Sequence, residues 1–323
     1  MQRRTRLILL AVLLALCASA AIVFLRMKAP PAIAQLLPEC DAIVFLNLKP
    51  VRAATHFDRN PSPRAPAFQQ FIDATGIVPE RDIDSAAFAL HHMQDPSGPN
   101  GPTAFSEIFR GRFDSPRLTH YLASLASSQE SYAGHILYSI PSEGRTLRVT
   151  LLDSDMIAAS NMPTPEQIHS MLDRRRTSFF SPAGPSLLNA RFGDVPALSS
   201  VWAIGQLALP LSAHGQLSAF GVALPLSAES TFVASLRFTT ALHLRIDQMT
   251  RTDAEATQSV QSLTTLLLLL RNLQPTARSD EEVALRQFVE SISIQQHGER
   301  ASLTATIPPE LLKHLDTLQP AAP

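Results

Sequence analysis

A charge-free apolar run near the start of the chain constrains the protein more than any other feature. Leu7 to Leu25 covers 19 residues without a charged side chain. At a helical rise of about 1.5 Å per residue the run is roughly 28 Å long, close to the hydrocarbon thickness of a bilayer. The run therefore predicts a transmembrane helix. We expect this membrane anchor to include Leu7, Leu10, Leu14, Ile22 and Leu25.

Two short segments resemble signal-peptidase sites, and neither is well placed. Ala18-Ser19-Ala20 has the small-x-small form, but Ile22, Val23, Phe24 and Leu25 follow it, so that cleavage would fall inside the apolar run. Ala32-Ile33-Ala34 lies beyond Arg26 and Lys28, and charges between the apolar run and a cleavage site disfavour processing. We therefore predict an uncleaved anchor, with cleavage after Ala34 as the alternative.

Flanking charges predict the orientation of the anchor. Arg3, Arg4 and Arg6 precede the apolar run together with the terminal amine, whereas Arg26 and Lys28 follow it. The excess of cations before the run favours a cytoplasmic N-terminus. The predicted location is the bacterial inner membrane, crossed once, with the body outside the cytoplasm in the periplasm.

The body after residue 28 has an acidic balance. The chain has 27 Lys and Arg, five of which lie in residues 1–28, so 22 remain against 28 Asp and Glu, a net charge of −6. An acidic surface is poorly suited to a phosphate backbone, so we expect no nucleic-acid partner. Cys17 lies in the apolar run and Cys40 is alone in the body. Without a disulfide, a hydrophobic core must stabilise the fold.

Local periodicity predicts alternating strands and helices in the first half of the body. The most apolar segment, Ala42–Leu48, is expected to be a strand buried on both faces. Helix starts are expected at Ser115, followed by Pro116, and at Thr164, with Gln167 in a capping-box position. Further strands are expected at Ser85–His91 and Ala104–Phe113 and around residues 136–140 and 147–151, with helices at Ala67–Ala74, Ser115–Leu125 and after Pro165.

The clearest element of the second half is Thr231–Asp247, which alternates apolar and polar residues. We expect one long strand with its even-numbered side chains in the core and its odd-numbered side chains in water. Five consecutive leucines, Leu266–Leu270, make a following helix apolar nearly all round, so it is either buried or a partner surface. Helices are expected from Thr252, from Ser279 and at Glu310–Leu318, and a hairpin at residues 292–307.

The element order predicts an α+β fold. Each half reads as strand, helix, two strands and helix, the order of a ferredoxin-like (split βαβ) lobe with a mainly antiparallel sheet. The predicted organisation is a membrane anchor (1–28), a Pro-rich, semi-extended spacer (29–40), a first α+β lobe (41–177), a linker (178–199), a second α+β lobe (200–318) and a tail (319–323).

Leu37-Pro38 followed by the strand Asp41–Leu48 resembles the start of the extracytoplasmic part of several uncharacterised bacterial families. These families are single-pass, membrane-anchored proteins of alternating strands and helices. The resemblance covers mainly the anchor, the spacer and the first strand. It implies a similar anchored body and carries over no catalytic residues.

Charged residues interrupt the apolar segment Phe105–Phe113. Glu107, Arg110 and Arg112 alternate there with aromatic and aliphatic residues. We interpret the charges as protection of an edge strand against aggregation. The functional alternative is an anion or partner contact at Arg110 and Arg112, with Gly111 allowing close backbone approach.

No residue pattern predicts a metal, cofactor or catalytic site. His91 and His92 are strand neighbours, which point to opposite faces and so do not share a metal readily. Asp82 and Asp84, like Asp153 and Asp155, lie at expected turns, where aspartate is favoured for its own backbone hydrogen bonds. The HExxH, Cys-x-x-Cys, phosphate-loop and Gly-x-Ser-x-Gly motifs are absent from the sequence.

These observations favour a membrane-anchored, non-catalytic binding or structural module of the cell envelope. Its partners would be the lipid bilayer, through the N-terminal helix, and another envelope protein. Two alternatives remain: a binder of lipids or other apolar ligands between the lobes, and a hydrolase with a site assembled from distant residues.

We predict that the full-length protein is retained in the membrane, because the apolar run has no well-placed processing site. Cell fractionation followed by N-terminal sequencing should find it in the membrane pellet, beginning at or near Met1. A soluble species that begins at Gln35 would contradict the anchor.

Overall fold

The computed structural model describes residues 29–59, 64–178, 184–206, 218–219, 222–223, 230–239, 241–272 and 279–312. The predicted anchor and the predicted tail lie outside these residues. Within them, no helix is both long enough and apolar enough to cross a membrane.

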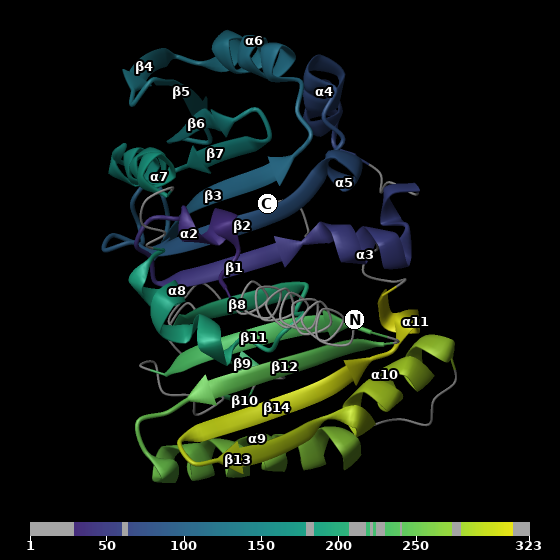
Figure 1. Ribbon diagram of the computed structural model, residues 1–323. Helices are drawn as coiled ribbons and strands as arrows, with labels where there is room; N and C mark the ends of the chain where they lie inside the picture. The colour runs from purple at the N-terminus through teal and green to yellow at the C-terminus, as the bar shows by residue number, and fades with distance from the viewer. Residues whose placement is uncertain are drawn as a thin grey trace, which may run out of the picture.

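Twelve strands of the described residues form one antiparallel sheet that runs through the molecule (Figure 1). From one edge to the other they are β13 (Ser293–His297), β14 (Arg300–Ile307), β12 (Leu242–Met249), β11 (Thr231–Phe238), β8 (Val201–Gln206), β1 (Ala42–Asn47), β2 (Ile83–His92), β3 (Thr103–Gly111), β7 (Met156–Ser160), β6 (Arg145–Asp153), β5 (His135–Ser142) and β4 (Ser128–Tyr132). A separate small sheet pairs β9 (Ser218–Ala219) with β10 (Val222–Ala223).

The mixed α+β composition with antiparallel pairing agrees with the sequence, but two ferredoxin-like lobes are not confirmed. β1, from the first predicted lobe, pairs with β8, from the second, and β8 pairs in turn with β11. The strands of both predicted lobes therefore belong to one sheet. A pairing between segments 150 residues apart has no local sequence signal.

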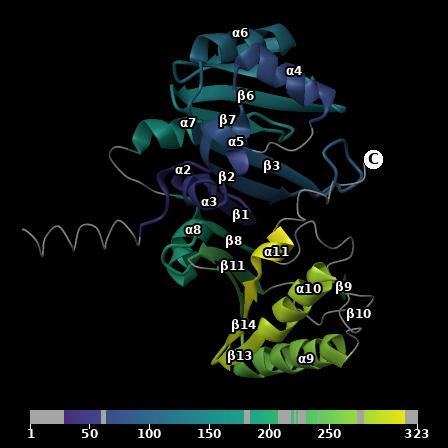
Figure 2. The same cartoon turned by 90° about the vertical axis from the view of Figure 1, so that its right-hand side faces the viewer.

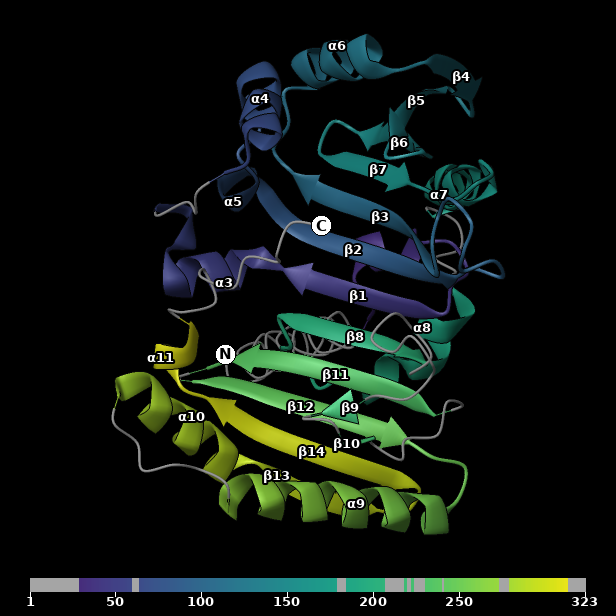
Figure 3. The ribbon, with the colours of Figure 1, turned by 180° about the vertical axis from the view of Figure 1, so that it is seen from behind.

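Helices lie on both faces of this sheet. Figure 2 shows α2, α7 and α8 on one side and α9 and α10 on the other, and Figure 3 shows α9 and α10 against β13 and β14. The helices are α2 (Ala32–Gln35), α3 (Leu48–Thr55), α4 (Pro66–Thr75), α5 (Pro79–Asp82), α6 (Ser115–Leu125), α7 (Glu166–Thr177), α8 (Ser186–Arg191), α9 (Asp253–Asn272), α10 (Asp280–Ser291) and α11 (Pro309–Leu312), with short 3-10 turns η1 (Phe57–Arg59) and η2 (Phe192–Asp194).

Three helix starts show how well capping was predicted. The capping box of α10 is confirmed, because the Ser279 hydroxyl accepts from the Glu282 amide and the Glu282 carboxylate accepts from the Ser279 amide. In α6 the cap is Asp114, one residue before the predicted Ser115, and it accepts from the Arg117 amide at 3.1 Å. The box predicted at Thr164 is wrong: Pro165 occupies the cap position, without a side-chain capping bond.

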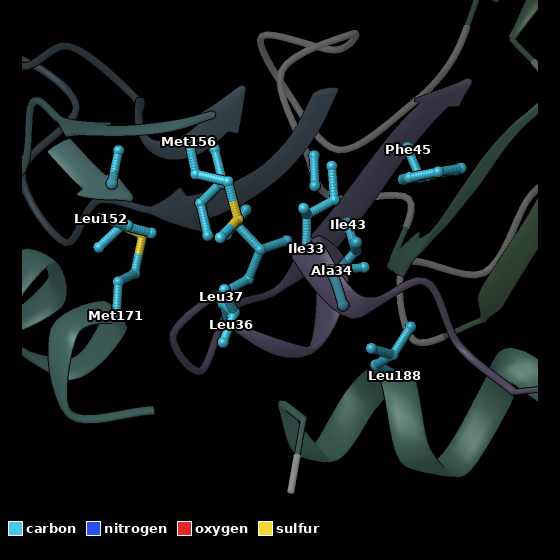
Figure 4. Close-up of a cluster of buried hydrophobic side chains, with 14 of the residues drawn as sticks. Ile33, Ala34, Leu36, Leu37, Ile43, Phe45, Leu152, Met156, Met171 and Leu188 are labelled. Atoms are coloured by element: carbon cyan, nitrogen blue, oxygen red, sulfur yellow. The ribbon is translucent and has the colours of Figure 1, made fainter. Parts of the chain in front are cut away.

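The segment expected to be a semi-extended spacer contains α2 instead. Ile33, Leu36 and Leu37 are 3%, 5% and 0% exposed and belong to the main core. They pack near Met156 and Met171, from β7 and α7 (Figure 4). Ile33 lies in α2, Leu36 is its C-cap residue and Leu37 follows it, and burial of these three side chains outweighs the extended preference of the neighbouring prolines.

The predicted long strand Thr231–Asp247 is a hairpin, with β11 and β12 joined between Phe238 and Leu242. The register pairs Leu236 with Leu244, so each face of the hairpin keeps one parity. The prediction for the odd face is confirmed at Arg237, which is exposed, and wrong at Val233 and Asp247, which are 1% and 0% exposed. Alternation reveals which side chains share a face, but not which face the rest of the fold covers.

The leucine-rich helix α9 is buried on one side only. Leu267 is 7% exposed, whereas Leu268 and Leu269 are 53% and 46% exposed. α9 therefore packs on β13 and β14 through a stripe, as an amphipathic helix does.

We predict that Leu37→Ala lowers the free energy of unfolding by about 2–5 kcal/mol, because it leaves a cavity in the core under the sheet. The matched control is Leu198→Ala, at a residue that is 70% exposed, where we expect a change within about 0.5 kcal/mol. Urea denaturation of both variants measures the difference. If the two substitutions lowered the free energy of unfolding equally, the packing of α2 and the residues that follow it into the core would be contradicted.

Candidate functional site

The two arginines predicted as an anion or partner contact have different partners, and only Arg112 lines a pocket. β3 is flanked by β2 and β7, so the interpretation as an edge strand was wrong. Arg110 pairs with Asp155 at 2.8 Å on the exposed surface. Arg112 donates to the Arg81 carbonyl at 2.9 Å and lies 3.6 Å from Asp82.

Glu107 lies on the opposite face of β3 from Arg110, in apolar surroundings. Phe88 is its cross-strand partner, and Phe105 and Phe109 flank it on the same face. Its carboxyl has no hydrogen-bond or ion-pair partner within the described part of the chain. Burial raises the pKa of Glu107 from 4.5 to about 7.

Arg112 contributes to an open basic pocket of about 530 Å³. Its charged and polar lining residues are Lys49, Arg52, His56, Asp58, Asp84 and Arg112. Arg52 is held in the wall by the carbonyls of Glu80 and Ile83 and by Asp84. Burial alone would raise the pKa of Asp84, but hydrogen bonds from Lys49 and Arg52 outweigh it and lower the pKa.

The acidic pairs of the sequence are engaged with arginines. Asp82 accepts from Arg81 at 2.7 Å, and Asp153 pairs with Arg175 at 2.7 Å. His91 is buried against Ser106, whereas His92 is exposed. Among the described residues, no three His, Cys, Asp or Glu side chains come together as metal ligands would.

The most convergent set of hydrogen-bond donors lines a cleft of about 300 Å³ on the odd face of the hairpin. We call it the polar cleft. Its polar lining includes Ser235, Arg237, His243, Arg245, Thr304 and Thr306. Pro196, in the turn before β8, lies on its rim.

Strand register builds the polar cleft from two rows. Ser235, Arg245 and Thr304 are directly opposite one another on β11, β12 and β14. The second row lies two residues further along the strands. In it Arg237 is opposite His243, and His243 is opposite Thr306. Residues two apart on a strand share a face, so all six side chains leave the sheet on one side.

A buried carboxylate fixes one of the two arginines. Asp247 is 0% exposed and lies 2.9 Å from Arg245, 3.5 Å from Arg300 and 2.7 Å from the Ser302 hydroxyl. Asp194 of η2 holds Arg300 from the other side at 2.5 Å. Asp247 therefore orients the Arg245 guanidinium at the floor of the cleft, and the buried charge is compensated by hydrogen bonds.

Arg237 differs from Arg245 in having no partner. It is exposed, and its guanidinium makes no hydrogen bond or ion pair within the residues that the structure describes. His243 makes only a long contact of 3.4 Å to Thr306. The six strand side chains thus combine an anchored guanidinium, an unpaired one, an imidazole and three hydroxyls, a donor set that suits an anion with several oxygen atoms.

The sequence analysis missed these residues because it assigned Arg237, His243 and Arg245 to the water-facing side of a strand. Their alternation was a usable signal, since five of the six odd-numbered residues from Ser235 to Arg245 are polar, with Ala241 as the exception. No signal in the sequence indicates that β14 pairs with β12, and it is this pairing that brings Thr304 and Thr306 into the cleft.

Comparisons with known proteins give little further guidance. No family model matches the chain, and no curated protein matches it. Among solved structures it is similar to crystal form III of TP0453, with 12% identity, a TM-score of 0.48, and coverage of 90% of this chain and 99% of the other. For crystal form IV the values are 9%, 0.46, 90% and 98%. TM-scores below 0.5 support no statement about this chain.

We predict a pH-dependent contribution of Glu107 to stability. Its pKa is raised in the folded state, so folding retains a proton between about pH 4.5 and pH 7, and stability falls as the pH rises through that window. Glu107→Gln mimics the protonated acid. It should stabilise the protein by about 1–3 kcal/mol at pH 8 and have little effect at pH 4.5.

Urea denaturation of the parent and of Glu107→Gln across this pH range measures the effect, because all other titrating groups are shared. Glu299→Gln, at an exposed turn, is the control and should show no such trend. A stability difference that does not change with pH would contradict a half-buried Glu107 that keeps its proton in the folded state.

Proposed function

We propose that the chain is a membrane-anchored, extracytoplasmic module that binds an anionic component of the cell envelope in the polar cleft, without catalysing a reaction. The apolar run of residues 7–25 and its flanking charges support the anchor and the orientation. The bilayer is then one partner, and the source of the anion, an envelope component, is the other.

The unpaired guanidinium of Arg237 is the observation that carries this proposal. Most surface arginines described above have a carboxylate or carbonyl partner, as Arg110 and Arg112 do. Arg237 instead lies diagonally across the hairpin from Arg245, whose direction Asp247 fixes. Two guanidinium groups without an intervening acid favour a bound carboxylate or phosphate, which accepts paired hydrogen bonds from arginine.

The donor set favours binding over catalysis. Acyl transfer by a serine needs a base within hydrogen-bond reach of the hydroxyl. Ser235 and His243 lie in different rows of the cleft, and no hydrogen bond joins them in the described part of the chain. All six polar side chains can donate to one ligand, with Ser235 and the threonines adding hydroxyl bonds to the charged ones.

We predict that the full-length protein in detergent binds inorganic phosphate, and that Arg237→Gln weakens binding at least tenfold. The loss of one charge-assisted hydrogen-bonding group, about 1.5–3 kcal/mol, corresponds to this factor. Isothermal titration calorimetry at low salt measures both affinities.

Arg176→Gln is the matched control, since Arg176 is 72% exposed on α7, away from the cleft, and should leave binding unchanged. Absence of phosphate binding by the parent, or equal weakening by the two substitutions, would refute the assignment of the cleft.

A further inference from the structure

The basic pocket and the polar cleft open at the same end of the sheet. β1, β3, β11 and β14 are mutually parallel through their antiparallel neighbours, and in Figure 1 the arrows of β1, β3 and β14 point to the side on which α3 and α10 lie. Lys49 and Arg112 follow the ends of β1 and β3, and Arg237 lies near the end of β11.

Two backbone hydrogen bonds align the end of β1 with the end of β11 along the strand direction. The Asn47 amide donates to the Ser200 carbonyl at 2.7 Å, and the Ser200 amide donates to the Leu236 carbonyl at 2.9 Å. Lys49 and Arg237 come just after this line. From β2, which contributes Asp84, to β11 there are three strand spacings, or about 14 Å.

Within the basic pocket, two cations are exposed at the surface, and each also has a partner in the chain: Lys49 pairs with Asp84 at 3.0 Å, and Arg112 donates to the Arg81 carbonyl. Lys49 and Arg52 share one face of α3, at i and i+3, and His56 is the C-cap residue of that helix. Arg52 is only 16% exposed and supports the wall, whereas the side chains of Lys49 and Arg112 are 66% and 68% exposed. Three cations against Asp58 and Asp84 leave the lining with a net charge of +1, a local exception to the acidic balance of the body as a whole.

Among the described residues, two uncharged segments lie between the two sites. The turn from Val195 to Ser200 contains no charged residue, and Asn47 and Leu48 complete the path. A single small anion fits one site only. A chain with recurring anionic groups could occupy both at once and gain from the short distance between them.

We propose that the protein binds a linear phosphate polymer across the polar cleft and the basic pocket. This inference rests on the proposed function and names its ligand class. A tetrahedral phosphate offers more acceptor oxygens than a carboxylate to the arginines and hydroxyls of the cleft. The lining residues that the structure describes include no Phe, Tyr or Trp at either site, so a nucleic-acid base has no ring to stack on.

The test compares the full-length protein, in detergent, with inorganic phosphate, tripolyphosphate, long-chain polyphosphate, polyglutamate and an oligothymidylate as ligands. We expect long-chain polyphosphate to bind at least 100-fold more tightly than phosphate, as bivalent engagement allows. The double variant Lys49→Gln/Arg112→Gln should lose at least tenfold of the polymer affinity and keep the phosphate affinity. Arg237→Gln should weaken both, and Arg176→Gln neither.

Thermal melts of the variants establish that each is folded, and the outcomes separate the two proposals. If phosphate binds but the polymer gains nothing, or if Lys49→Gln/Arg112→Gln leaves polymer binding intact, the two-site inference is wrong and the polar cleft stands. Binding of polyglutamate or the oligothymidylate as tightly as polyphosphate overturns the phosphate-polymer assignment. If the parent binds neither phosphate nor polyphosphate, both proposals fail.

Discussion

The pairing of β1 with β8 is the constraint on which the rest of the structure depends. It joins strands formed by residues 42–47 and 201–206, and so merges the two halves of the chain into one sheet. Ile43 and Ile204 are opposite each other and fully buried there. At the end of the pair, Gly205 faces Ala42 so closely that a side chain at Gly205 would collide with it. Both candidate sites are positioned relative to this seam.

Beside the polar cleft, the sheet buries the carboxylate of Asp247 together with partners that compensate its charge. Asp247 is inaccessible, yet Arg245, Arg300 and Ser302 all bond to it, and Asp194 extends the network to the helical layer. Such a network is costly to leave half formed, because each unpaired member would keep its desolvation penalty. The same contacts that compensate Asp247 also turn Arg245 toward the cleft, so stability and ligand geometry depend on one carboxylate.

Much of the secondary structure could be predicted from local patterns, and the architecture could not. Strands such as Ala42–Asn47 and the capping box at Ser279 have signals within a few residues. β4 (SQESY) is polar and lies at the sheet edge, so it has no alternation to detect, and β8 is defined by partners far away in the chain. Of the two predicted site arginines, Arg112 reaches a basic pocket and Arg110 does not. The remaining members come from strand pairings that no short window contains.

The burial of α2 has a mechanical consequence for whatever precedes residue 29. Only Ala29, Pro30 and Pro31 separate that part of the chain from a helix whose apolar side is in the core. No long flexible linker therefore precedes the body at this point. A force applied to the chain on the N-terminal side acts directly on the packing under the sheet. A junction of three residues, two of them prolines with a fixed φ, is short and stiff.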